Sequence, residues 1–211
     1  MGSKHSFIDD FNPYIVLCSE EYKSAIDIFD AGLDNFSFNE FIKKEADEYK
    51  NIGDGVTYLV FNKQNNESDE IVAYFTLCSG AIPYVERWKV PKEEQEELGL
   101  EYEEIHCGIP AIELKMFAVS QKYQDVFYQH EDEQMPVSAW ILMSIIDMVY
   151  EMKSSIVGIK ALYLRSVPNA EIFYKKNGFD YVLKPMNPFY CIDDDYKAMY
   201  IPFVQTKIHY D

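Results

Sequence analysis

The chain has 211 residues, nearly half of them hydrophobic, which is enough for one well-buried domain and too few for two ordinary ones. Its 36 acidic and 19 basic residues give a net charge of −17, which repels phosphate backbones and anionic lipid. We therefore expect neither nucleic acid nor a membrane as a partner. The four cysteines are scattered, without zinc-site or disulfide-framework spacing, and no export signal opens the chain. These features indicate a cytoplasmic protein with free thiols and no bound metal.

The front half predicts one strand, two helices and a hairpin of two further strands, at residues 14–19, 22–29, 37–51, 55–62 and 71–79. In the second helix, apolar side chains recur every three or four residues, which places them on one face: Phe38, Phe41, Ile42, Ala46 and Tyr49. Either Asn35 or Ser37 could cap this helix.

The back half follows a charged excursion at residues 83–110, and it predicts strands at 111–120, 158–167, 179–185 and 196–204 and helices at 136–155 and 168–178. Pro136 suits the first helical position of the longer helix, and Gly178 would end the shorter one. The apolar stripe of the longer helix is Ile141, Leu142, Ile145, Ile146 and Val149. This order predicts one α/β domain over residues 1–211, with a mixed, twisted sheet covered by helices on both faces.

Three segments of the back half carry a family resemblance: "ELKMFAVSQKYQ", "VSAWILMSII" and "VPNAEIFYKKNGFDYV". In this order they resemble the central strand, the following helix and the Tyr-x-x-x-Gly-Phe segment of the GNAT superfamily of N-acetyltransferases. The front-half segment "IFDAGLDNFSFNEFIKKEADEY", with the strands that follow it, is similar to the toxin-type branch that modifies aminoacyl-tRNA. The resemblance implies the GNAT acyl-CoA N-acyltransferase fold, acetyl-CoA as acyl donor, a primary amine as acceptor and, in many members, a homodimer.

The resemblance also implies which residues bind acetyl-CoA. Main-chain N–H groups of Phe117, Ala118 and Val119 would hold the thioester, where donors aimed at a developing oxyanion lower the barrier. Gln124 takes the first position of the family's pyrophosphate motif, Gln/Arg-x-x-Gly-x-Gly/Ala. The N–H groups that open the following helix would bind the pyrophosphate, and these belong to Val137, Ser138 and Ala139.

The pyrophosphate loop departs from the family pattern. Pro136 and Ser138 stand where the motif has its two glycines, and an insertion, "FYQHEDEQM" at residues 127–135, precedes them. The proline still leaves the donors of the next three residues available. Acidic side chains at 131–133 would repel a pyrophosphate if the insertion folded inward, so we expect an acidic loop that folds outward.

Three further residues take catalytic or contact roles on the family pattern. Tyr174 would protonate the departing thiolate, although an aromatic that only packs a short helix is the alternative. Asn169 would contact the cofactor or a catalytic water, or else cap a helix. Glu113 stands five residues before Ala118, where the histone-acetylating branch has its general base; the alternative is a structural or substrate-orienting carboxylate that pairs with Lys115.

The sequence thus predicts transfer of an acetyl group from acetyl-CoA to an amine of a small molecule or protein. The acidic surface favours a cationic acceptor such as a polyamine, an aminoglycoside-like compound or a lysine-rich protein. A second hypothesis comes from the missing glycines: a GNAT-fold protein that has lost its cofactor and acts as an acidic interaction module.

Overall fold

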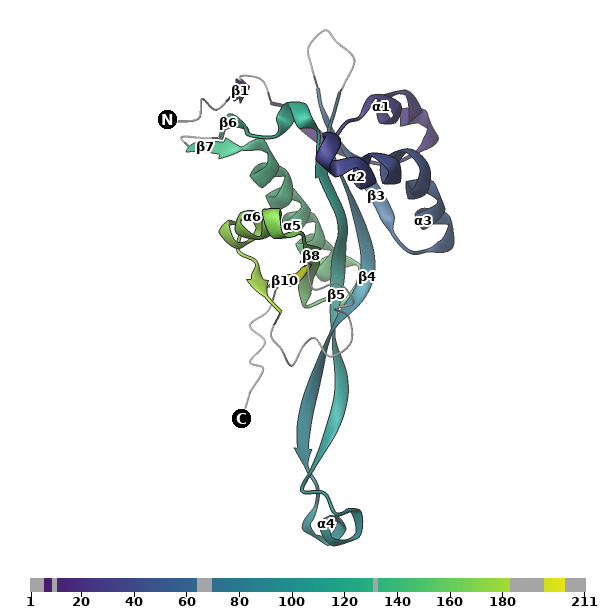
Figure 1. Cartoon of the computed structure of the whole chain (residues 1–211), viewed down its shortest axis with the longest axis vertical. Helices are drawn as coiled ribbons and strands as arrows, with labels where there is room; N and C mark the ends of the chain where they lie inside the picture. The colour runs from purple at the N-terminus through teal and green to yellow at the C-terminus, as the bar shows by residue number, and fades with distance from the viewer. Residues whose placement is uncertain (1–5, 9–10, 64–69, 131–132, 183–195, 204–211) are drawn as a thin grey trace. The chain divides into compact units, whose positions relative to one another are not determined.

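The computed structural model describes residues 6–8, 11–63, 70–130, 133–182 and 196–203 (Figure 1). The chain divides into two compact units, residues 1–79 with 114–152 and residues 80–113 with 153–211. Strands β4 (Glu70–Lys89) and β5 (Tyr102–Val119) both cross this division along the chain. The single domain expected over residues 1–211 stays a prediction. No helix within the described ranges is long and apolar enough to cross a lipid bilayer.

The first unit contains the predicted front-half strands. Strands β2 (Pro13–Leu17) and β3 (Val56–Asn62) pair antiparallel, and β3 pairs antiparallel with the start of β4. The order in this unit is β2-β3-β4-β5. The predicted hairpin is confirmed by the register, which runs from Val56↔Leu77 to Asn62↔Glu70 with a bulge after Val60.

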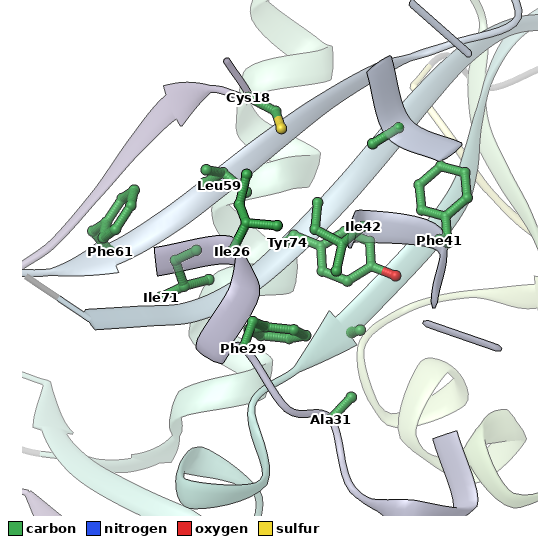
Figure 2. Close-up of a cluster of buried hydrophobic side chains, with 12 residues drawn as sticks. Cys18, Ile26, Phe29, Ala31, Phe41, Ile42, Leu59, Phe61, Ile71 and Tyr74 are labelled. Carbon is green, nitrogen blue, oxygen red and sulfur yellow. The ribbon is translucent and has the colours of Figure 1, made fainter. Parts of the chain in front are cut away.

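Six short helical segments cover one face of this part of the sheet: η1 (Glu20–Tyr22), α1 (Lys23–Ile28), η2 (Leu33–Asn35), α2 (Phe36–Glu40), the π-helical η3 (Phe41–Glu45) and α3 (Ala46–Ile52). Tyr74 of β4 lies in the core beneath them (Figure 2), stacked with Phe41 at 6.1 Å and edge-to-face with Phe29 at 5.4 Å. The Tyr74 hydroxyl donates a 2.8 Å hydrogen bond to the carbonyl of Phe38. The predicted apolar face of the second helix is therefore confirmed, since its members pack in this cluster.

The predicted side-chain cap of that helix is wrong for Asn35. Asn35 does occupy the N-cap position of α2, but it makes no side-chain cap hydrogen bond. Its amide instead donates a 2.8 Å bond to the carbonyl of Ala31. An amide side chain near a helix start can bond either the helix backbone or the backbone of the preceding loop, and Asn35 bonds the loop.

Helix α5 (Val137–Ser155) lies on the opposite face of this part of the sheet (Figures 1 and 2). Four of its five predicted stripe residues are fully buried, and Ile146 is half-buried. Burial of one such side chain stabilises a protein by about 1.5–3 kcal/mol, so the stripe is enough to dock the helix.

The insertion at 127–135 does not form the expected loop. Strands β6 (Val126–His130) and β7 (Glu133–Pro136) form a hairpin, and β1 (Ser6–Ile8) pairs with β6 in parallel, which makes a three-stranded sheet of order β1-β6-β7. Pro136 ends the edge strand β7 instead of beginning α5. An edge strand tolerates a proline because one of its sides needs no ladder hydrogen bond.

The second unit has the order β4-β5-β8-β10-β9, formed with β8 (Ala161–Ser166), β10 (Lys197–Pro202) and β9 (Asp180–Tyr181). Strand β8 is parallel to β5 and antiparallel to β10, so the sheet is mixed as predicted. The segments η5 (Pro168–Ala170) and α6 (Glu171–Lys176) follow β8. Gly178 has φ 89, which only glycine adopts readily, and it lies just beyond α6 as expected.

The charged excursion at 83–110 is an extension of two strands. Residues 80–89 of β4 and 102–110 of β5 continue to a short helix, α4 (Lys92–Leu98), at the end of the pair (Figure 1). The pair closes through a 3.0 Å bond from the Val90 amide to the Glu101 carbonyl and an ion pair between Arg87 and Glu104.

Candidate functional site

The predicted thioester donors lie on the last residues of β5. The recorded pairing of β8 with β5 covers Ala111–Glu113, and β5 continues for six residues beyond it. Ala118 is buried in the cluster under the front helices, so the alternation of a strand points Phe117 and Val119 to the opposite face. The Ser120 amide then bonds the Val72 carbonyl at 2.8 Å, which holds the strand end to β4.

The turn after β5 is held by a glutamine. The Gln124 side-chain amide donates to the Val119 carbonyl at 2.9 Å and to the Ala31 carbonyl at 3.0 Å. Gln124 therefore braces the loop in this structure, and its direct contact with a cofactor stays a prediction. Asp125 follows with φ 59, a left-handed conformation that costs most residues about 1–2 kcal/mol and favours glycine.

The loop after α1 is hydrogen-bonded to this turn. The Gln121 amide donates to the Asp30 carbonyl at 2.8 Å, and the Asp30 carboxylate accepts bonds from the Gly32 amide at 2.8 Å and the Asn39 side chain at 3.0 Å. Gly32 has φ 95 and faces the Gln121 side chain. Asp30 and Asn39 were missed by sequence reasoning. The signal for Asp30 was the Asp-x-Gly spacing at residues 30–32, which is typical of a tight turn.

The predicted pyrophosphate donors open α5 directly after β7. Val137 is buried, whereas Ser138 and Ala139 are half-buried. An aromatic cluster borders this helix start: Phe11 lies 4.9 Å from Tyr128 and 5.6 Å from Trp140, between ring centroids. Burial raises the pKa of Tyr128 to about 12.

Glu131 and Asp132 lie outside the described residues, and Glu133 is described only as a backbone member of β7. The expectation that these acids fold outward stays a prediction.

A pocket of about 270 Å³ lies elsewhere in the first unit. Its walls come from α1, the loop after it, the start of β4 and the turn after β5. The predicted acetyl-CoA contacts do not line it, so we do not assign the cofactor to this pocket.

In the second unit, Tyr174 lies on α6 and is buried. Its ring contacts Phe179 edge-on at 5.6 Å, and burial raises the pKa of its phenol. The phenol thus stays protonated at neutral pH, as a proton donor must. The packing alternative holds at the same time, because the same ring contributes to the core.

Glu113 has two partners from β8. Its Oε1 lies 3.4 Å from Arg165 Nη2, and its Oε2 accepts a 3.2 Å hydrogen bond from the Tyr163 hydroxyl. The Glu113 side chain is only 14 % exposed. Sequence reasoning offered Lys115 as a possible partner, which stays a prediction, and it missed both β8 residues, because the pairing of two strands 50 residues apart leaves no local signal.

Gly80 of β4 belongs to the same group. An alanine Cβ there would lie 2.4 Å from the Tyr163 hydroxyl oxygen, so the tyrosine occupies space that any side chain at this position would fill. Because Gly80 has no side chain, the Tyr163 hydroxyl has room to bond Glu113.

Asn169 is exposed within η5. The N-cap residues of η5 and α6 are Val167 and Ala170, so the alternative that Asn169 caps a helix is wrong. Its contact with a cofactor stays a prediction.

Comparison with known proteins shows the fold. No family model and no curated protein matches the chain in sequence. Among solved structures, a tyrosine-to-phenylalanine mutant of KacT matches with a TM-score of 0.59 and 16% identity, covering 90% of this chain and 94% of that one. The structure of AtaTR bound with AcCoA matches with a TM-score of 0.60, 18% identity and coverage of 90% and 94%.

A third match is AtaT complexed with acetyl-methionyl-tRNAfMet, with a TM-score of 0.56, 15% identity and coverage of 90% and 95%. A KacTA–DNA complex also matches. The chain therefore has the predicted GNAT fold, which it shares with these solved structures. The expectation that nucleic acid is no partner gains no support, because two matched structures contain tRNA or DNA.

Proposed function

We propose that this protein is an acetyl-CoA-dependent N-acetyltransferase. The observation that carries the proposal is the match to AtaTR bound with AcCoA, which covers 90% of this chain and 94% of that one. The strand and the helix in which the acetyl-CoA contacts were predicted are both present, since β5 runs past the recorded β8 ladder and α5 begins directly after the hairpin.

The residues of the first unit would bind acetyl-CoA. Amides of Phe117–Val119 would hold the thioester carbonyl, and the first amides of α5 would hold the pyrophosphate, where a helix start favours an anion. Half-buried Ser138 and Ala139 are small enough for a phosphate to approach the backbone. Bound acetyl-CoA supplies an activated acetyl group as a thioester.

Tyr174 and Glu113 would act on the protons. The acceptor nitrogen attacks the thioester carbonyl, so a C–N bond forms and the C–S bond breaks. A water, or Glu113, takes the proton that the amine loses. Tyr174 gives its proton to the departing thiolate and regains one from solvent.

Two acceptor classes are candidates. The net charge of −17 favours a small cationic amine. The match to AtaT complexed with acetyl-methionyl-tRNAfMet favours the α-amino group of an aminoacyl-tRNA. Added salt weakens the attraction of a cation to an acidic surface and also weakens the binding of tRNA that is held by a local basic patch, so the acceptor itself separates the two classes.

Release of free thiol from acetyl-CoA, measured with a panel of amines and aminoacyl-tRNAs, tests the activity. The proposal expects thiol release that depends on an acceptor and a product that is heavier by one acetyl group. If no acceptor class supports thiol release, the acidic interaction module becomes the better account.

A further inference from the structure

Arginine is rare in this chain, and one of its two arginines lies on a buried strand. Lysine supplies 17 of the 19 basic side chains, and the two exceptions are Arg87 and Arg165. A lysine would neutralise a nearby carboxylate equally well. Arginine adds a planar fork of five donors that suits carbonyl, carboxylate and phosphate oxygens.

The two arginines use their forks differently. Arg87 meets Glu104 through two nitrogens, at 3.1 Å from Nε and 3.0 Å from Nη2, and both side chains are well exposed. Arg165 has one recorded contact within the part of the chain that the structure describes, the 3.4 Å approach of Nη2 to Glu113. Its side chain is 47 % exposed, whereas the Glu113 side chain is 14 % exposed, so the guanidinium is the more accessible end of the pair.

The carboxylate end of this pair is held in place. Tyr163 bonds the second oxygen of Glu113, and the side chain that Gly80 lacks leaves the room that the Tyr163 hydroxyl occupies. The Glu113 carboxylate, bonded by Tyr163, and the half-exposed Arg165 guanidinium together place a negative and a positive group side by side. The complement of this pair is a ligand that carries an ammonium and an oxygen acceptor a few ångströms apart.

We propose that Arg165 is a specificity-determining residue that binds an oxygen of the acceptor next to the amine that is acetylated. This inference rests on the proposed function and deepens it. An acceptor with a carbonyl or carboxylate beside its amine uses both groups of the pair. A plain alkylamine or polyamine uses only Glu113 and is repelled by the guanidinium.

Two matched acceptors test the contact. Leucinamide and 3-methylbutylamine share the same branched chain, and only leucinamide has a carbonyl beside the amine. Steady-state acetylation of both is compared in the wild type, Arg165→Gln, Arg165→Lys and the control Arg87→Gln. Within one acceptor the reactivity of the amine cancels, so each variant is compared with the wild type on that acceptor.

Loss of a charge-assisted hydrogen bond lowers kcat/KM by about 10- to 100-fold. Arg165→Gln should show this loss with leucinamide and no loss, or a small gain, with 3-methylbutylamine, because the guanidinium only repels the plain amine. Arg165→Lys keeps the charge beside Glu113 and should recover part of the leucinamide activity. Arg87→Gln should match the wild type on both. Equal losses on both acceptors, or no loss on either, would overturn the proposal, since the first indicates a structural role and the second no role.

Binding without acetyl-CoA separates this inference from the proposed function. Saturation-transfer NMR on the same proteins, with leucinamide as the probe, should give a signal in the wild type and Arg87→Gln that is lost in Arg165→Gln. A retained signal in Arg165→Gln, or none in the wild type, contradicts the inference even if acetylation occurs. A signal with the expected pattern supports it even if no acetyl transfer is found.

Discussion

Replacing Gly80 with alanine should destabilise the protein through one side chain. The new Cβ would lie 2.4 Å from the hydroxyl oxygen, 2.9 Å from Cε1 and 3.1 Å from Cζ of Tyr163. These separations are well inside van der Waals contact at about 3.5 Å, so the tyrosine must move. Moving it breaks the bond to Glu113, and forcing an atom into a packed site typically costs about 1–3 kcal/mol. We expect a loss of about 2 kcal/mol in the free energy of unfolding.

Urea unfolding of Gly80→Ala, Tyr163→Leu and the double variant measures whether the cost depends on the tyrosine. Leucine has none of the three atoms that collide, so Gly80→Ala should cost less than about 0.5 kcal/mol in that background. Gly158→Ala is the matched control, because no atom outside its immediate neighbours lies within 4 Å of its Cβ position. It should be neutral or stabilise by up to about 1 kcal/mol. An equal cost of Gly80→Ala in both backgrounds would refute the reasoning.

Three further predictions concern single residues. Tyr174→Phe should lower turnover and leave the Kd of acetyl-CoA within about twofold. Because burial raises the pKa of Tyr174, wild-type turnover should not fall at alkaline pH below about pH 10. A fall centred at about pH 8 would assign the proton donor to another residue. Asp125→Gly should raise the free energy of unfolding by about 0.5–1 kcal/mol, because the left-handed φ of 59° suits glycine. It should also tighten acetyl-CoA binding, because it removes a negative charge beside the predicted pyrophosphate loop. Weaker binding in calorimetry would contradict the placement of that loop. Tyr74→Phe should cost about 1 kcal/mol in urea unfolding, because the hydroxyl's 2.8 Å hydrogen bond to the part-buried Phe38 carbonyl is lost; no loss would show that water replaces the hydroxyl.

Local patterns were sufficient for most of the fold. The alternating and three-to-four spacings placed β3, the start of β4 and the apolar stripe of α5 correctly, because each depends on residues within one element. The hairpin at 127–135 was missed for the opposite reason. Its parallel partner β1 comes from residues 6–8, and a pairing between segments so far apart along the chain leaves no trace in the local sequence.

The candidate site was predictable only in part. Tyr174 and the start of α5 lie in the predicted elements, because a short motif with fixed spacing identified them. The side-chain bonds of Gln124 and the partners of Glu113 depend on which strands and loops become neighbours, and only the structure shows this. Arg165 had one sequence signal, the rarity of arginine, which gains meaning once its neighbours are known.

Calorimetric titration of the folded wild-type protein with acetyl-CoA measures whether this protein binds the acyl donor at all. We expect saturable one-to-one binding with a Kd in the micromolar range, although the two motif glycines are replaced by Pro136 and Ser138. Absence of heat up to millimolar acetyl-CoA, with the protein shown to be folded, would contradict this expectation and leave a GNAT fold without its acyl donor.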